Sequence, residues 1–267
     1  MTKTWVMGVT ALVVNGLLAC SGSDVPAPGS GATPAAAGSA NGSAGSSPTA
    51  GAPADPTPPA PTSVETTETF GELHSGDGTY YTFADGTGAC MYDKTSDIHI
   101  AALNGFDWAG SAWCGACADV TGPNGNRVRV RIVDECPDCA KGQLDFHPDA
   151  FALLAPKEQG RIPITWSFVA CDAQGPVSYK FKDGSNPWWT AVQVRNSRFP
   201  IAKLESSKDG VNFVEAQRQD YNYFLNGSGF GQGTTQVRIT ASNGATLLDT
   251  LPEVKAELVV LGSSQFR

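Results

Sequence analysis

The sequence lacks a basic region. The chain has 18 Lys and Arg against 26 Asp and Glu, and its formal net charge is −8. Residues 64–171 hold 7 basic and 15 acidic side chains, and residues 172–267 hold 10 and 9. Binding of nucleic acid needs a positive surface against the phosphates, and neither half supplies one. The charge therefore argues against nucleic acid or another polyanion as a partner and suits an uncharged polymer.

The sequence also lacks an apolar run long enough to span a bilayer, which takes about 20 residues. Residues 1–20 contain one cation, Lys3, then a shorter apolar stretch and small residues, a pattern typical of an export signal. The ending Leu17–Cys20 resembles the lipobox of bacterial lipoproteins, in which the cysteine is lipidated. Ser21 would then be compatible with sorting to an outer membrane. The alternative is an ordinary secretory signal in which Cys20 has no function.

Residues 21–63 have almost none of the apolar side chains that a core needs. They are nearly all Gly, Ala, Ser, Pro and Thr, which predicts a disordered tether. A coil of this length would span roughly 35–40 Å. The remainder is enough for two domains of about 100 residues each, which we place at 64–172 and 176–267. The short junction between them predicts a packed interface and one continuous surface.

The second predicted domain has no cysteine, whereas the first has six. Two Cys-x-x-Cys pairs, Cys114 with Cys117 and Cys136 with Cys139, are separated by 18 residues, a spacing that fits a zinc ribbon. A zinc site would leave Cys90 and Cys171 unpaired, whereas three disulfides use every thiol. Thiols also pair in the oxidising space outside the cell. We therefore expect disulfides, and the sequence alone allows 15 connectivities.

Helical periodicity is almost absent. In the first domain GTYYTF and the alternating RVRVRIV read as strands, GPNGN as a hairpin turn, and only HPDAFALLA as a helix. The second domain has strand-like segments at short intervals, punctuated by Gly and Asn turns. They are VSYKFKD, WTAVQVRN, IAKLESS, NFVEAQR, TQVRITAS and KAELVVLG. We expect a mostly β protein, a small barrel followed by a β-sandwich.

Two carboxylates stand at the ends of a loop that Cys136 and Cys139 would close. Asp134 precedes the loop, and Asp145 follows it between Leu144 and Phe146. Such a loop could bring both carboxyl groups to one groove, and glycoside hydrolysis uses a pair of them. Acidic loop residues are more often simply solvated. For Asp145, strand alternation would leave the side chain facing outward, or burial would raise its pKa.

Trp188 and Trp189 stand side by side after Pro187. In an extended strand, neighbouring side chains point to opposite faces. Val192 and Val194 would then face the core, Trp189 would share the other face with Ala191, Gln193 and Arg195, and Trp188 would be buried. Pro187 has no N–H and could interrupt the strand there, which would display both rings. The residues alone leave core packing and surface display equally open.

Five segments resemble the expansins, in particular the bacterial expansin-like proteins. They are GTYYTFADGTGAC, WCGAC, VDECP, LDF and PWWTAVQVRN, in the right order from about Leu73 to the C-terminus. The resemblance implies a six-stranded double-psi β-barrel followed by an immunoglobulin-like, cellulose-binding β-sandwich. Members of this family loosen plant cell walls without cutting glycosidic bonds.

The resemblance also implies roles for residues of the barrel. Asp145 matches the aspartate that the family needs for loosening, Asp134 the aspartate of its Thr-Asp motif, and Thr79 the threonine of its Ala-Thr-Phe or Ala-Thr-Tyr motif. Gln143 stands where plant members have His, and Cys136 where bacterial members often have Tyr. The plant-like disulfide pairing would be Cys90–Cys114, Cys117–Cys171 and Cys136–Cys139.

The related family-45 glycoside hydrolases share the barrel and the acid but add a base shortly after a Tyr-Trp pair. Aligned on TYYTF, the base position is Phe83, whose ring cannot accept a proton, and Asp85 is the only obvious substitute. We therefore expect a protein without catalytic residues for hydrolysis, and no metal or organic cofactor is implied.

In the second domain the family displays two tryptophans in a flat row with a tyrosine. Trp188, Trp189 and Tyr221 match these rings, and Lys182 matches a lysine beside them. Aromatic faces stack on the axial C–H groups of a glucan chain. The resemblance thus predicts an exported monomer, lipid-anchored or secreted, that binds cellulose and other cell-wall glucans.

Two rival functions stay open. One is a glycan-cleaving enzyme, either an endoglucanase or a peptidoglycan lytic transglycosylase, because bacterial RlpA-type proteins carry a related barrel and are also lipid-tethered. The other is a pure carbohydrate-binding protein with a vestigial barrel. The sequence assigns no role to the three histidines, including His147.

Overall fold

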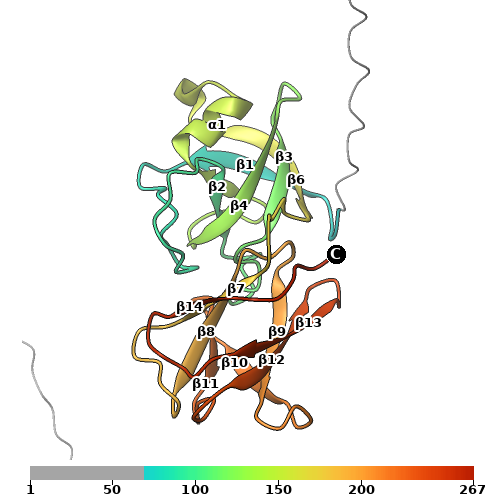
Figure 1. The fold of residues 1–267 in the computed structure, drawn as a ribbon. Helices are drawn as coiled ribbons and strands as arrows, with labels where there is room; N and C mark the ends of the chain where they lie inside the picture. Colours follow the sequence, from blue (N-terminus) through green and yellow to red (C-terminus); the bar gives the residue numbers. More distant parts are fainter. Residues whose placement is uncertain (1–68) are drawn as a thin grey trace, which may run out of the picture. The chain divides into compact units, whose positions relative to one another are not determined.

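The computed structural model describes residues 69–267, which form a closed barrel and a second, eight-stranded sheet (Figure 1). The predicted signal peptide and tether lie outside this range, and no helix within it is long and apolar enough to cross a membrane. The barrel comprises β1 (His74–Tyr80), β2 (Ile100–Asn104), β3 (Cys117–Thr121), β4 (Arg127–Cys136), β5 (Leu144–Phe146), α1 (Pro148–Leu154), the 3-10 turn η1 (Lys157–Gln159) and β6 (Ile162–Val169). The second sheet comprises β7 (Ser178–Phe181), β8 (Thr190–Arg195), β9 (Ile201–Ser207), β10 (Val214–Arg218), β11 (Phe224–Asn226), β12 (Thr235–Ala241), β13 (Thr246–Leu251) and β14 (Val259–Leu261).

The barrel closes in the strand order β1-β5-β2-β4-β3-β6. Two of its pairings, β1 with β5 and β2 with β4, are parallel and join segments far apart in the sequence. Along β4 the side chains of Val128, Val130 and Ile132 point into the core, as the alternating pattern predicts. The predicted six-stranded, mostly β barrel is confirmed.

Two local predictions in the barrel are also confirmed. β3 and β4 form the expected hairpin, closed by a bond from Gly122 N to Asn126 O at 2.9 Å. The expected helix is α1, which has Pro148 in its first turn and Phe151 and Leu154 in the core. His147, which had no assigned role, caps this helix because its Nδ1 accepts a hydrogen bond from the backbone N–H of Asp149 at 3.1 Å.

The six cysteines of the barrel form three disulfides, and the pairing is the one that the resemblance implied. The bonds join Cys90 to Cys114, Cys117 to Cys171 and Cys136 to Cys139. The zinc-ribbon alternative is therefore wrong, because each Cys-x-x-Cys thiol is already covalently paired. Residues 69–267 hold no group of three or more His, Cys, Asp or Glu side chains placed to bind a metal ion.

The second sheet has the order β13-β12-β9-β10-β11-β8-β7-β14 and packs around its own core. β10 pairs with both β9 and β11. All eight strands of the sandwich are therefore linked by hydrogen bonds into one continuous sheet. Val192 and Val194 are buried in this core, as predicted. The predicted barrel-and-sandwich fold is confirmed, whereas the short β11 and the half-exposed β13 were not anticipated.

The barrel covers part of the outer face of β7 and β8. Gln193 Nε2 and Asn222 Nδ2 both donate to the carbonyl oxygen of Cys90, at 2.8 and 3.2 Å. Lys180, which pairs with Gln193 across the strands, forms an ion pair of 3.0 Å with Asp93 of the same barrel loop. Gln193 is consequently fully buried, although a polar side chain on the outer face of a sheet usually meets solvent.

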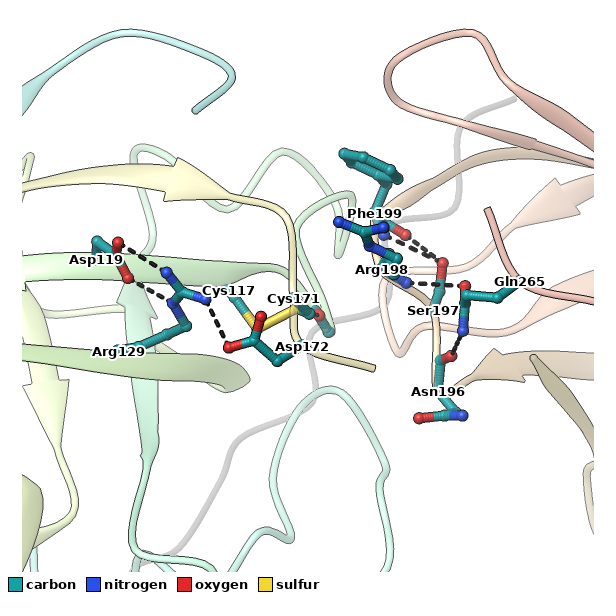
Figure 2. The surroundings of a disulfide bond; sticks show 11 residues. Cys117, Asp119, Arg129, Cys171, Asp172, Asn196, Ser197, Arg198, Phe199 and Gln265 are labelled. Carbon is teal, nitrogen blue, oxygen red and sulfur yellow. Dashed lines mark hydrogen bonds and ion pairs between the residues drawn. A yellow bond between two sulfur atoms is a disulfide. The ribbon is translucent and has the colours of Figure 1, made fainter. Parts of the chain in front are cut away.

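The end of the barrel that holds the Cys117–Cys171 disulfide also contacts the connection between β8 and β9 and the C-terminal segment (Figure 2). Cys171, held to Cys117 by its disulfide, donates its backbone N–H to the carbonyl of Arg198 at 2.8 Å. The side chain of Gln265 accepts from Arg198 N at 3.2 Å and donates to Asn196 O at 2.6 Å (Figure 2). The predicted packed junction is therefore made of specific hydrogen bonds.

Candidate functional site

The strand register of the barrel places two carboxylates and a threonine in one row. Asp134 on β4 pairs with Ala102 on β2, Ala102 pairs with Asp145 on β5, and Asp145 pairs with Thr79 on β1. Directly paired residues lie on the same face of a sheet. Leu103, next to Ala102, belongs to the barrel core, so the row lies on the outside of the barrel. We call these four residues the carboxyl row.

The two carboxylates of the carboxyl row are two strands apart. Adjacent strands are spaced by about 4.8 Å, so the backbones of Asp134 and Asp145 are separated by about 10 Å. Ala102 lies between them and is itself buried. The register gives a structural basis for the expectation that both carboxylates lie on one face of the barrel.

Asp145 is half-buried and carries a hydrogen bond at one oxygen only. Thr79 Oγ1 donates to its Oδ1 at 2.5 Å, and Gln143 Nε2 in turn donates to Thr79 Oγ1 at 3.1 Å. Burial raises the pKa of Asp145, against the bond from Thr79 and the charge of Arg161, which lower it. The group therefore retains a proton to a higher pH than an exposed aspartate, in the direction that burial predicts.

Asp134 is held by the loop that follows β1. Its Oδ1 accepts hydrogen bonds from the backbone N–H groups of Ala89 at 2.6 Å and Glu135 at 2.8 Å. Gly88 passes so close that a Cβ there would lie 2.3 Å from the carboxyl carbon of Asp134. A side chain at position 88 would therefore displace Asp134, and glycine is required for this approach.

Tyr81 is a site residue that the sequence did not single out. Its hydroxyl is buried and has no hydrogen-bond partner among the described residues. Burial raises its pKa, and the nearby charges of Asp134, Asp145 and Asp85 raise it further, so the hydroxyl stays protonated and can donate. A buried donor without a partner costs about 1–3 kcal/mol and points to a ligand or water at this place. The only sequence signal was the position of Tyr81 two residues after Thr79, on the same face.

Asp85, the possible substitute for a catalytic base, is held by a hydrogen bond and an ion pair within its own loop. It accepts a hydrogen bond from Thr87 Oγ1 at 2.5 Å and forms an ion pair with Lys94 at 3.0 Å. These contacts lower its pKa to about 2, the bond from Thr87 contributing most. Such a group is a weak proton acceptor. Phe83, at the position of the base in the hydrolases, is 86% exposed.

Trp188 lies in a tight turn rather than in a strand. Asn186 N donates to Trp189 O at 2.8 Å and Trp189 N to Asn186 O at 3.2 Å, so Pro187 and Trp188 occupy the two central positions of the turn. β8 begins only at Thr190, one residue later than WTAVQVRN predicted. Strict alternation would bury Trp188, and that interpretation is wrong, because this side chain is 58% exposed.

The other members of the predicted binding surface are half-buried. They are Trp189, Tyr221 and Lys182, and the Nζ of Lys182 lies 6.0 Å from the centre of the Tyr221 ring. The ring contacts of residues 69–267 include none between either tryptophan and Tyr221, so these rings are separate contact points. We call these three residues, together with Trp188, the aromatic surface.

The aromatic surface continues the sheet face that the barrel covers. Lys180 and Gln193 pair on that face, and alternation places Lys182 and Trp189 on it, two and four residues further along. The barrel loop between β1 and β2 contacts both the carboxyl row and the covered face of the second sheet. Its Ala89 binds Asp134 of the carboxyl row, and the next residue, Cys90, accepts the bonds from Gln193 and Asn222.

Fold and site together define a two-domain β protein with a carboxyl-lined barrel face next to a sandwich with exposed aromatic rings. No family model matches the chain. It is 34% identical over 197 residues to Expansin-YoaJ of Bacillus subtilis, a match that covers 72% of this chain and 84% of that one. It is 31% identical over 206 residues to Expansin-like protein 3 of Dictyostelium discoideum, covering 73% of this chain and 61% of that longer one.

Solved structures agree with these relatives. The fold matches that of Clavibacter michiganensis expansin with a TM-score of 0.68 at 29% identity, over 73% of this chain and 98% of that one. A variant of the same expansin in complex with cellohexaose matches equally well. The chain belongs to the expansin family.

Proposed function

We propose that this chain is an exported protein that binds cellulose through its sandwich and loosens glucan packing through its barrel, without cutting glycosidic bonds. The observation that carries the proposal is the placement of the carboxyl row and the aromatic surface on two parts joined by one loop, Ala89–Cys90. The likeness to an expansin solved with cellohexaose supports a glucan as the ligand.

The aromatic surface suits the flat face of a glucan chain. Trp188 is largely exposed, and Trp189 and Tyr221 present part of their rings. If each ring removes on the order of 80–100 Å² of apolar area from water, the gain is roughly 2 kcal/mol per ring. Three rings supply about 6 kcal/mol before ordering costs, which corresponds to affinities near the micromolar range at best.

The geometry of the carboxyl row supports loosening rather than hydrolysis. An inverting hydrolase needs an acid on one side of the sugar and a base that activates water on the opposite side. Asp134 and Asp145 stand on the same sheet surface and so approach a bound chain from the same side. Phe83 cannot accept a proton, and Asp85 is bound to Lys94 and Thr87.

The carboxyl row offers hydrogen bonds that compete with those between glucan chains. A hydrogen bond to a charged group contributes about 1.5–3 kcal/mol, against about 0.5–1.5 kcal/mol for a neutral pair. Oδ2 of Asp145 accepts no hydrogen bond from the described residues, and the Tyr81 hydroxyl donates none to them. Asp145 thus keeps a free acceptor for a sugar hydroxyl, and the buried Tyr81 hydroxyl keeps a free donor for a ligand or water that reaches it.

A second candidate function is general-acid cleavage of a glycan, as in a lytic transglycosylase. The raised pKa of Asp145 favours it, because a general acid must hold its proton near neutral pH. This function needs the protonated form of Asp145, whereas the competing acceptor needs the ionised form. The two proposals therefore predict opposite dependences on pH.

A paired assay tests the proposed function. We expect the full mature chain to bind insoluble cellulose and to weaken cellulose paper under load. It should release no reducing ends from cellulose and no soluble fragments, including those with 1,6-anhydro ends, from peptidoglycan. The control is an endoglucanase at equal concentration, which must release sugar under the same conditions. A steady yield of oligosaccharides from this chain would contradict the non-hydrolytic proposal and favour cleavage.

We also propose that the protein is anchored to the cell envelope by a lipid on Cys20. Three disulfides in the barrel fit an oxidising space outside the cytoplasm, and the Leu17–Cys20 ending supports a lipoprotein signal. Mass spectrometry of the mature protein is expected to find an acylated Cys20 as the first residue. A mature N-terminus beyond residue 20 without a lipid would refute the anchor.

A further inference from the structure

A cavity of about 290 Å³ opens in the sandwich where β9 and β11 end and β10 and β12 begin. Sites for drug-sized ligands have volumes of about 300–1,000 Å³, so this one suits a smaller molecule. Its lining combines hydroxyl, amide and apolar groups. Among the lining residues are Ser206, Asp209, Asn212, Asn226, Phe230 and Thr235.

Ser206 indicates that the cavity takes a ligand with hydrogen-bonding groups. The residue is 6% exposed and lines the cavity, yet no described residue hydrogen-bonds its hydroxyl. Among residues 69–267 the Tyr81 hydroxyl is the only fully buried side-chain polar atom without a partner, so the Ser206 hydroxyl opens to the cavity and is free to bond a ligand. A hydroxyl of a bound molecule would satisfy it.

The charged groups beside the cavity already have hydrogen-bond partners within the chain, which leaves neutral groups to contact a ligand. Lys208 Nζ donates to the carbonyl oxygens of Gln232 at 2.7 Å and Thr234 at 2.9 Å. Asp209 Oδ1 accepts from Ser207 Oγ at 2.9 Å and from Asn212 N at 2.8 Å. The hydrogen-bonding capacity that remains comes from hydroxyl and amide groups, which suit sugar hydroxyls.

The cavity lies directly behind the turn that carries Trp188. Gly229 lines the cavity, and a Cβ at this position would lie 2.1 Å from the carbonyl oxygen of Pro187 and 2.5 Å from the carbonyl carbon of Trp188. Gly231 N donates to the same carbonyl oxygen of Pro187 at 2.7 Å. The backbone of the turn that carries Trp188 therefore packs against the wall of the cavity at Gly229.

We propose that this cavity binds one or two neutral pyranose rings at the end or on a side branch of a glucan that lies on the aromatic surface. The inference rests on the proposed function for the presence of the glucan. It adds a second kind of recognition, because flat rings hold any exposed chain whereas a cavity selects a chain end or a branch. Ser206 and Asn226 are the residues expected to contact the sugar hydroxyls.

Titration calorimetry of the full mature chain with two oligosaccharides tests this site. The probes are cellohexaose, which has free ends and no branch, and a xyloglucan oligosaccharide, whose backbone carries xylose branches. Val214 lines the cavity and is 60% exposed, so Val214→Trp would obstruct it with little effect on the fold. Val211, 78% exposed and not part of the lining, gives the matched control Val211→Trp.

We expect Val214→Trp to weaken oligosaccharide binding at least ten-fold and Ser206→Val by about five-fold, as for the loss of one hydrogen bond. Val211→Trp should bind like the parent chain. A loss for both probes indicates a chain end as the ligand, and a loss for the branched probe alone indicates a branch. Equal binding by Val214→Trp and Val211→Trp, or no binding of either probe by the parent chain, would overturn the site.

Pull-down on insoluble cellulose separates this inference from the proposed function. All three variants should keep it, because the aromatic surface is unchanged in them. If Val214→Trp binds oligosaccharides as well as the parent chain does, and cellulose is still bound, the cavity site is rejected but the proposed function is not. A parent chain that binds no cellulose would reject the proposed function whatever the calorimetry shows.

Discussion

Replacement of Trp188, Trp189 and Tyr221 together by alanine is expected to abolish binding to insoluble cellulose. At roughly 2 kcal/mol per ring, the variant loses about 6 kcal/mol, or about 10⁴-fold in affinity. None of these residues belongs to the buried core, so the sandwich should still fold. The measurement is the fraction of protein removed from solution by microcrystalline cellulose across a range of cellulose concentrations.

Two controls isolate ring stacking in this experiment. Leu248→Ala removes another exposed apolar side chain, 56% exposed on β13, and should leave binding unchanged. Tyr221→Phe keeps the ring and removes the hydroxyl, and should also retain binding. Cellulose binding by the triple variant at the level of the Leu248→Ala control would eliminate the aromatic surface as the binding site.

The display of Trp188 shows where a simple periodic rule fails. The rule of alternating faces assumes a strand, and it placed Trp188 in the core. The chain instead reverses at Pro187 and Trp188, and the Asn186 side chain fixes the reversal by accepting from Trp188 N at 2.9 Å and Trp189 N at 3.2 Å. Asn and Pro at these positions are common turn residues. Asn186 and Pro187 thus indicate a turn in the sequence, but the rule of alternating faces does not take turn residues into account.

Burial of Gln193 could not be predicted from the sequence. Its neighbours Val192 and Val194 face the sandwich core, as the pattern indicates, so alternation places Gln193 on the opposite face of β8 but does not say what covers that face. Cys90, which accepts its hydrogen bond, lies 103 residues earlier in the chain. The docking of the barrel on this face depends on the whole surface of both parts, which no local pattern encodes.

The carboxyl row was predictable only in part. Motif resemblance singled out Asp134, Asp145 and Thr79, but their alignment depends on parallel pairing between β1 and β5 and between β2 and β4. Such pairings join distant segments and have no hairpin that would fix their register. Ala102, which separates the two carboxylates, and Tyr81, which lies near them, therefore became visible only in the folded chain.

Asp145→Asn is expected to reduce wall or paper creep ten-fold or more while leaving cellulose binding unchanged. The amide oxygen can still accept from Thr79, but an NH₂ group replaces the free acceptor Oδ2 and the charge is lost. The difference between a charged and a neutral hydrogen bond is about 1–2 kcal/mol, which corresponds to about ten-fold. The measurement is the extension rate of cellulose paper or isolated wall under constant load.

The direction in which Asp145→Asn changes the stability of the fold can also be predicted. Burial raises the pKa of Asp145 in the folded chain. Such a group contributes its full stability below its ordinary pKa and loses it as the pH rises through the raised value. At a pH above the raised pKa the parent chain therefore carries an ionised, half-buried group that Asn removes, so the melting temperature of Asp145→Asn measured there should not fall. Lost creep with an unchanged melting temperature is then a loss of function and not of fold.

Two tyrosine variants test the same part of the barrel. Tyr81→Phe removes the unpartnered hydroxyl and should lower creep, whereas Tyr80→Phe removes a hydroxyl that donates to Lys157 O at 3.3 Å, on the other side of β1, and should not. Creep at the parental rate in both Asp145→Asn and Tyr81→Phe would mean that the barrel takes no part. The protein would then act only as a carbohydrate-binding module.

The pH profile of the parent chain decides which form of Asp145 acts. If the ionised carboxylate competes for glucan hydroxyls, creep should decline as the pH falls through the raised pKa of Asp145, while the aromatic surface still binds cellulose. A general acid would show the reverse, with activity that increases as the pH falls and disappears in alkali. Creep that increases on acidification and vanishes in Asp145→Asn would therefore exclude the acceptor role and require the proton on Asp145.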